Sequence, residues 1–209
     1  RRYSGGKAPR GYGWIVIARA GIRTFLAKRA LLMLLLTGWT RFLIASVQLY
    51  FAANMPQSVA SLPQAGLLAV TADTFHDMVD SWFVNLVVFL ITVYVGAGLI
   101  ANDRRANALQ IYLSKPLTRV EYVFGKLAIL MTFLLFVTWL PAIALLIVQM
   151  MFAGNFTFLQ NNAYLFPAIT LFAFLQVTMV ATAMLALSSL SKSSRYVGIL
   201  YAAVIFFTQ

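Results

Sequence analysis

Long apolar runs that carry almost no charge constrain this chain more than any other feature of its sequence. They lie at about 31–53, 82–101, 127–153 and 165–190, with a further, truncated run at 196–209. A membrane-crossing helix needs about 20 consecutive apolar residues, so each complete run is long enough to span a bilayer. The runs lack the alternating polarity of barrel strands. The pattern predicts an all-α integral membrane protein, a polytopic helical bundle with five visible spans.

The amino-acid composition also indicates a chain surrounded by membrane lipid. Hydrophobic residues make up 62% of the 209 residues, charged residues make up 10%, and the mean hydropathy is +0.85. Soluble domains contain about 45–50% apolar and about 25% charged residues. We therefore expect lipid around most of the chain. Because the chain begins with Arg1 rather than Met and ends within an apolar run, we also expect it to be part of a longer protein.

Lysine and arginine are segregated along the chain. All except Arg41 lie before residue 30, in 102–126 or in 191–195, whereas the loops at 54–81 and 154–164 contain none. Positive loops stay in the cytoplasm, so the N-terminus is predicted to be cytoplasmic. The membrane itself is expected to be a bacterial-type inner (plasma) membrane. A formal charge of +11 arranged in this way favours contact with anionic membrane lipids. Nucleic acid is not expected as a partner, because its binding sites gather cations on a folded basic face.

The first thirty residues form a region of their own. Residues 1–13 are rich in glycine and cations and are typical of a cytoplasmic tail. From Trp14 to Arg29, apolar residues alternate with cations at near-helical spacing. This stretch is too charged to cross a membrane, so we expect an amphipathic helix in the inner interface. The chain then divides into 1–30, a tail with an interfacial elbow helix, and 31–209, a transmembrane domain.

Arg41 lies close to the middle of the first apolar run. A cation at the centre of a transmembrane helix costs about 2.5–3.5 kcal/mol on insertion scales. One interpretation is that Arg41 faces a substrate path, or binds backbone carbonyls or Asp103. The other is that its side chain reaches back to the inner interface. The sequence leaves both open.

Residues that carry out chemistry are few, because the chain has one His, five acidic residues and no Cys. The outer loop places Asp73, His76, Asp77 and Asp80 at spacings that align pairs on one helical face. They match no specific metal-site pattern, and we interpret the loop as solvated and acidic. No apolar run contains a His for haem. We expect no catalytic residue, metal or cofactor in this chain.

The cytoplasmic stretch 102–126 is the most informative loop. Residues 106–113 are compatible with a short helix, which Pro116 ends because the residue before a proline avoids the α region. Thr118 can then cap a new helix, with Glu121 at the spacing of a capping box. The loop is predicted to contain two short cytoplasmic helices around a turn.

This loop resembles that of the permease subunits of type 2 ATP-binding-cassette (ABC-2) exporters. The resemblance is carried by the pair Asp103 and Arg104, the turn LSKPLTR at 113–119, and the pair Gly125 and Lys126. The order of the spans and the basic helix before them are also similar. The sequence departs from the family at residues 107–108, where a Gly-Thr pair is common, and at Asp103, where Glu is frequent.

The resemblance implies a coupling mechanism. In such exporters two permease subunits, identical or related, pair with two cytoplasmic ATPases that bind ATP and magnesium. The inner-loop helix docks on the ATPase, and the elbow helix carries the motion sideways. The implied coupling residues are Asp103, Arg104, Asn107, Leu109, Gln110, Tyr112 and Leu113. The resemblance also implies a sixth span after Gln209.

Polar residues inside the runs are candidates for a substrate path, although such residues often only bridge helices. They are Arg41, Gln48, Asn85, Thr92, Thr138 and Gln176. No glycine-rich phosphate loop occurs in the chain, so ATP hydrolysis is expected on a partner. The leading hypothesis is a permease that exports an unidentified substrate. The alternative is a non-transporting anchor or scaffold subunit of a larger membrane complex.

Overall fold

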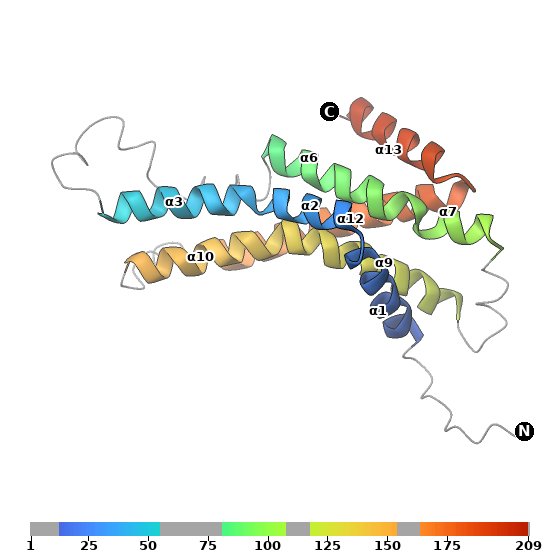
Figure 1. Ribbon diagram of the computed structural model, residues 1–209, viewed down its shortest axis with the longest axis horizontal. Coiled ribbons are helices and arrows are strands. Elements are labelled where there is room, and N and C mark those ends of the chain that lie inside the picture. Colours follow the sequence, from blue (N-terminus) through green and yellow to red (C-terminus); the bar gives the residue numbers. More distant parts are fainter. Residues whose placement is uncertain (1–12, 55–80, 108–117, 154–163, 209) are drawn as a thin grey trace, which may run out of the picture. The chain divides into compact units, whose positions relative to one another are not determined.

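A computed structural model of the protein describes residues 13–54, 81–107, 118–153 and 164–208. Helices make up nearly all of these residues, and no β-strand occurs among them (Figure 1). The all-α prediction is therefore confirmed. Its physical reason is that hydrocarbon offers backbone N–H and C=O groups no partner, so each segment has to satisfy them internally.

Four helical stretches of the described chain are long and apolar enough to cross a membrane. They are Arg29–Phe51, Trp82–Arg105, Arg119–Phe152 and Leu165–Leu190. A shorter apolar helix of 15 residues, α13 (Ser194–Thr208), follows them. These helices match the predicted polytopic bundle.

The first stretch is interrupted at Trp39. Helix α1 (Gly13–Leu26) precedes it, and the stretch itself consists of α2 (Arg29–Gly38) and α3 (Thr40–Asn54). A side-chain carbon on Gly38 would clash with Val137, so the glycine permits a close approach at the break. The single uninterrupted helix that the apolar run suggested is thus two helices.

The second stretch changes its helical geometry midway. Helix α6 (Trp82–Ile91) passes into a π-helical turn, η2 (Thr92–Gly96), and then into α7 (Ala97–Arg105). A π-helical turn leaves part of the regular hydrogen-bond pattern unfilled and is often found at functional sites. The sequence pattern does not predict this turn, because apolar periodicity does not distinguish a π-turn from an α-turn.

The third stretch begins earlier than predicted. Helix α9 (Arg119–Val137) is continuous, so the second short cytoplasmic helix expected after Thr118 is in fact the start of the membrane helix. After Thr138 the chain continues as α10 (Trp139–Ala153). Pro141 explains this break, because it has no N–H to donate to the carbonyl of Val137.

The chain divides into two compact units. The first combines Arg1–Leu31, Thr92–Thr132 and Val180–Gln209, and the second combines Leu32–Ile91 and Phe133–Met179. The last long helix, α12 (Leu165–Leu190), contributes residues to both. Each unit has its own buried residues and is described separately.

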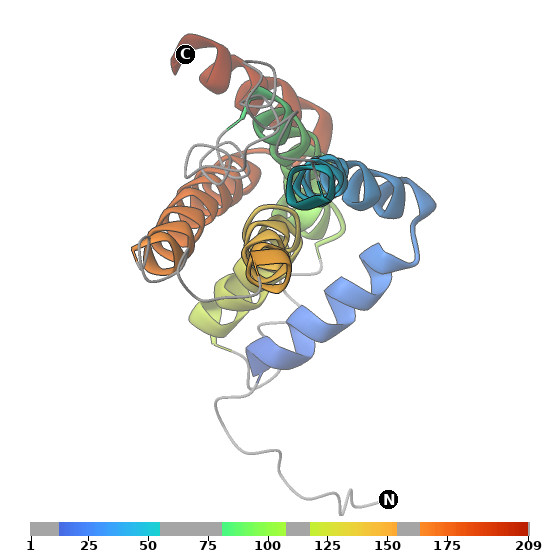
Figure 2. The same cartoon turned by 90° about the vertical axis from the view of Figure 1, so that its left-hand side faces the viewer.

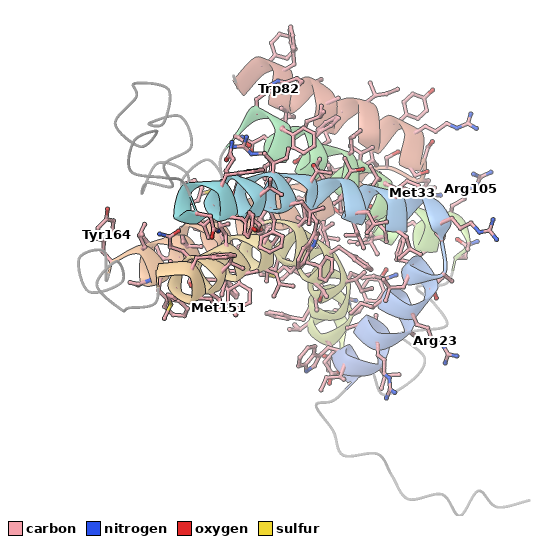
Figure 3. The ribbon with its side chains drawn as sticks, turned by 60° about the vertical axis from the view of Figure 1, so that its left-hand side comes forward. Arg23, Met33, Trp82, Arg105, Met151 and Tyr164 are labelled. Atoms are coloured by element: carbon pink, nitrogen blue, oxygen red, sulfur yellow. The ribbon has the colours of Figure 1, made fainter. Side chains whose placement is uncertain are left out.

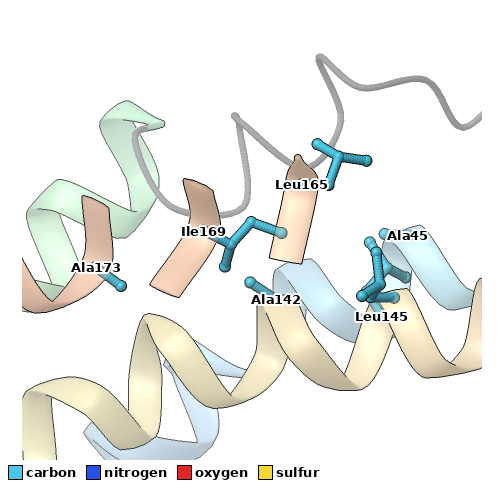
Figure 4. Packing of buried hydrophobic residues seen from close by; sticks show 7 residues of the cluster. Ala45, Ala142, Leu145, Leu165, Ile169 and Ala173 are labelled. Atoms are coloured by element: carbon cyan, nitrogen blue, oxygen red, sulfur yellow. The ribbon is translucent and has the colours of Figure 1, made fainter. Parts of the chain in front are cut away.

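The second unit is built around α3, α10 and the first half of α12. Its core is a cluster of small and branched residues (Figure 4), and larger side chains such as Trp139 pack against it. The cluster contains Ala45, Ala142, Leu145, Leu146, Leu165, Ile169 and Ala173. Small residues at helix contacts allow close packing, which is how membrane helices associate when hydrocarbon surrounds them.

The first unit packs α1, η2, α7 and α13 with the start of α9 and the end of α12. Figures 1 and 2 show α1 beside the beginning of α9, and α13 alongside α7. Gly96 lies at the centre of this packing, because an added Cβ would stand 2.6 Å from Met184 Cγ and 3.1 Å from Leu130 Cδ2. The π-helical turn therefore ends in a tightly packed environment.

Candidate functional site

Asp103 joins α7 to α9 at the end of the second membrane stretch. Its Oδ2 lies 2.8 Å from the Nζ of Lys126 and accepts a 2.7 Å hydrogen bond from the Tyr122 hydroxyl. The Lys126 and Asp103 side chains are only 12% and 18% exposed. Lys126 Nζ also lies 5.5 Å from the centre of the Tyr122 ring. Charge-assisted bonds at this degree of burial hold the two helices in one arrangement.

Ser188 joins α12 to α7. Its side chain is fully buried, and its hydroxyl donates a 3.0 Å hydrogen bond to the carbonyl of Ala97. The same oxygen accepts hydrogen bonds from the N–H groups of Ile100 at 3.2 Å and Ala101 at 3.1 Å. One hydroxyl thus binds the backbone of α7 directly after the π-helical turn.

A second bond between these helices lies closer to the C-terminal end of each of them. The Arg104 guanidinium donates to the carbonyl of Ser189, near the end of α12. Cations near the last turn of a helix bind carbonyls that have no partner within the helix. We call the group formed by Asp103, Arg104, Tyr122, Lys126 and Ser188 the loop clamp, because it fixes both ends of the inner loop.

The first end of the inner loop leaves α7 through Asn107. This residue has a left-handed backbone with φ 54°. The N–H groups of Ala106 and Asn107 donate to the carbonyls of Asn102 at 2.9 Å and Arg104 at 3.3 Å. Asparagine tolerates this conformation better than most residues, which suits a helix end. The short helix predicted from residue 106 is therefore wrong at its first two positions, which close α7 instead.

The second end of the loop enters α9 through the predicted capping box. The Thr118 hydroxyl accepts a 3.2 Å hydrogen bond from the N–H of Glu121, and Glu121 Oε2 accepts one of 2.9 Å from the N–H of Thr118. Each side chain satisfies a donor that the first helical turn leaves without a partner. The prediction of this cap is confirmed.

Helix α1 lies against α9 at two glycines. An added Cβ at Gly125 would stand 2.9 Å from the Cβ of Ile17 and 3.1 Å from the carbonyl oxygen of Trp14. A Cβ at Gly21 would clash with Ile129. Only glycine allows this approach, so Gly125 serves to seat α1 on α9. On its other side α1 is basic and exposed, and Figure 3 shows Arg23 pointing away from the ribbon.

The predicted coupling residues are described only in part. Asp103 and Arg104 belong to the loop clamp, and Asn107 ends α7. The remaining coupling residues lie outside the described residues: Leu109, Gln110, Tyr112 and Leu113. The structure thus defines the two ends of the loop, and the docking face itself stays a prediction.

The candidate path residues are distributed over both units. Gln176 donates a 3.1 Å hydrogen bond to the side-chain oxygen of Asn85, so the structure brings these two together in the second unit. The Thr138 hydroxyl donates a hydrogen bond to the carbonyl of Leu134, one helical turn earlier in the sequence. Arg41 and Gln48 are half-buried in α3, and Thr92 is fully buried in η2 of the first unit.

Several buried polar atoms of the second unit have no hydrogen-bond partner within the described part of the chain. They are Trp39 Nε1, Ser46 Oγ, Gln149 Oε1 and Gln176 Oε1. Such atoms cost about 1–3 kcal/mol each when no partner reaches them. The second unit therefore offers polar atoms that a further partner would satisfy.

The acidic outer loop with Asp73, His76, Asp77 and Asp80 lies outside the described residues. Among the residues that the structure does describe, no three His, Cys, Asp or Glu side chains form a group that could hold a metal ion. The expectation that the outer loop holds no metal therefore stays a prediction.

The sequence pattern did not identify Ser188, Tyr122 and Lys126 as partners of α7. A basic residue at the start of a span is common at the inner interface, so Lys126 gave no sign of an ion pair. The adjacent Ser188 and Ser189 were the one available signal, because consecutive serines near the end of an apolar run often bind a neighbouring helix.

One of the comparisons with known proteins identifies a family. Residues 15–209 match the model of a family described as ABC-2 family transporter protein. No curated protein and no solved structure matches the chain. Because the family match covers far more than half of the sequence, this chain belongs to the ABC-2 family of membrane transport permeases, which are not themselves catalytic.

Proposed function

We propose that this chain is the permease subunit of an ABC exporter, coupled to a separate cytoplasmic ATPase that binds ATP and magnesium. It would pair with a second permease subunit, either a copy or a relative, in a bacterial-type inner membrane. Its N-terminus and the loop 102–126 would face the cytoplasm, as the segregation of the cations favours.

The loop clamp is the observation that carries this proposal. It fixes both ends of the inner loop to three helices, through Asp103 to α9 and through Arg104 and Ser188 to α12. A force applied to the loop by an ATPase would therefore move α7, α9 and α12 together. Without such bonds, a loop would absorb the displacement by bending at its ends.

Helix α1 supports the same mechanism. Its close contact with Gly125 places it one residue from Lys126 of the loop clamp. A movement of α9 would therefore carry α1 along the membrane surface. This is the role expected of an elbow helix.

The second unit supports the proposal of a substrate path or of a contact with another subunit. Some of its buried polar atoms, including Ser46 Oγ and Gln149 Oε1, have no partner among the described residues, and they are costly in hydrocarbon unless water, substrate or another subunit reaches them. Asn85 and Gln176 already bind one another, so we propose them as a polar pair beside such a path.

The test is co-purification of an ATPase with the full chain, followed by measurement of ATP hydrolysis. The variant carries Leu109→Asp and Tyr112→Asp on the proposed docking face. A matched control carries Leu190→Asp and Tyr196→Asp, which are 73% and 72% exposed and lie outside the loop. We expect the loop variant to lose the ATPase or its stimulated activity at least tenfold, and the control to keep both.

The alternative function is a non-transporting anchor subunit that uses the same loop as a protein interface. In that case no ATPase co-purifies with the unmodified chain, or the loop variant hydrolyses ATP as fast as the parent. Either result would remove the exporter proposal. Loss of activity in both variants would show that acidic residues at this end disturb folding in general, and it would likewise contradict a specific docking face.

A further inference from the structure

A groove of about 450 Å³ runs between the second membrane stretch and α13 in the first unit. One wall comes from η2 and α7, with Val93, Tyr94 and Asn102. The other comes from the first turns of α13, with Arg195 and Ile199. None of these residues belongs to the loop clamp, and the proposed coupling mechanism does not use the groove.

The polarity of the groove changes along its length. Asn102 is near the C-terminal end of α7, and Ser194 and Arg195 begin α13, so these three polar lining residues gather where the two helices meet the loops. Val93 and Ile199 lie further along their helices, toward the apolar interior. A ligand that fills the whole groove needs a polar end and an apolar end.

The polar end is positively charged. Arg195 is exposed, and both acidic residues within the described ranges are engaged elsewhere, Asp103 by Lys126 and Glu121 by Thr118. Lys192 and Arg105 are also exposed in this unit, and Figure 3 shows Arg105 pointing away from the ribbon. A cationic guanidinium with a neighbouring amide and hydroxyl is chemistry that binds a phosphate group.

At the apolar end of the groove, the two helices approach each other closely. An added Cβ at Gly198 would stand 3.2 Å from Val93 Cγ1, so glycine brings α13 near η2 at this level. Ile199, which is 67% exposed, continues the apolar surface outward. The groove therefore leads from a basic mouth to an apolar wall that is open to the side, as an acyl chain requires.

We propose that this groove binds one anionic phospholipid. Its phosphate would lie at Arg195, Asn102 and Ser194, and one acyl chain would run along Val93 and Ile199. A free phosphate would use the basic mouth and gain nothing from the apolar wall. The order of polar and apolar residues therefore favours a lipid, and the positive charge favours an anionic headgroup. The lipid would bridge α7 and α13 whether or not the chain transports anything.

The test is native mass spectrometry of the full-length protein in neutral detergent. It is titrated with phosphatidylglycerol or with phosphatidylcholine that has the same acyl chains. We expect phosphatidylglycerol to bind more tightly, and Arg195→Gln to weaken it about fivefold, the effect of one cation near a membrane surface. Phosphatidylcholine affinity should change little. The matched control is Lys192→Gln, an exposed cation three residues away that does not line the groove.

A second measurement locates the lipid. Phosphatidylglycerol with a photoreactive acyl chain should label Val93 or Ile199 in the parent and lose most of that label in Arg195→Gln. Equal losses for Arg195→Gln and Lys192→Gln would show general surface charge and overturn the proposal. So would equal affinity for both lipids. The proposal would also fail if Ile199→Cys formed dimeric disulfides at a yield that added phosphatidylglycerol does not lower, because a second copy would then cover the groove.

Discussion

Ser188 shows how much one side chain contributes where a helix changes geometry. Its hydroxyl binds three backbone groups of α7, immediately after the π-helical turn. Backbone groups at such a turn have fewer partners within their own helix. A fully buried hydroxyl from a neighbouring helix replaces those partners, and this couples α12 to the shape of the second membrane stretch.

Replacing Ser188 by Ala should therefore destabilise the protein by about 1–3 kcal/mol, because buried backbone groups lose their partner. Ser189→Ala is the matched control, since Ser189 is exposed and its hydroxyl binds the Ala186 carbonyl of its own helix at 2.7 Å. Thermal unfolding in detergent measures both variants. Equal unfolding temperatures would mean that the bonds of Ser188 do not hold α7.

At the residue scale, the sequence was a better guide to which side chains are unusual than to which residues they contact. Asp103 and Arg104 stood out because they end an apolar run, and both bind neighbouring helices. Asn85 and Gln176 were recognised as polar residues in spans, yet their pairing requires knowing how two helices are rotated. Arg41 was recognised as a cation inside an apolar run, but its depth in the membrane depends on where the helix begins and ends.

At the scale of elements, local rules predicted one helix start and explain one break. Thr118 and Glu121 form the expected cap, and the break at Thr138 follows from the missing N–H of Pro141. The interruption at Trp39 and the turn η2 were not predicted. Both lie beside glycines whose role is a close contact with a distant helix, and a single sequence does not reveal such contacts.

The contact between α1 and α9 predicts a specific disulfide. A Cβ at Gly125 would lie 2.9 Å from that of Ile17, and disulfides join Cβ atoms at about 3.5–4.5 Å, so a small shift suffices. Ile17→Cys with Gly125→Cys should cross-link on oxidation, and the chain has no other Cys. The change is read as altered mobility on a non-reducing gel and confirmed by mass spectrometry of the linked peptides.

The control for this pair is Ile17→Cys with Phe124→Cys. Phe124 is adjacent to Gly125 but 58% exposed, so it lies on another side of α9. This pair should stay unlinked under the same oxidant. Equal cross-linking of both pairs would show that α1 does not pack against α9 in one fixed position. The proposed role of an elbow helix would then lose its structural support.

At the scale of the whole molecule, the distribution of charge predicts the orientation in the membrane. Apart from Arg41, all of the cations lie on one predicted side, which is the condition under which positive charge most reliably sets topology. The helix count followed directly from the apolar runs, because run length and bilayer thickness leave few choices. The arrangement of helices within each unit did not follow, because uniformly apolar helices have no strong face that specifies a neighbour.

Orientation is testable with two single cysteines at opposite ends of α12. Tyr164→Cys and Leu190→Cys lie at sites that are 59% and 73% exposed, and no native Cys adds background. The 26 residues of α12 span about 39 Å at 1.5 Å per residue, so its ends reach opposite sides of a hydrocarbon core of about 30 Å. A membrane-impermeant maleimide should label Tyr164→Cys on intact spheroplasts, and Leu190→Cys only in inverted vesicles. The reverse pattern would place the loop clamp outside the cell, away from any cytoplasmic ATPase, and labelling of both sites from both sides would mean that the cations do not fix the topology.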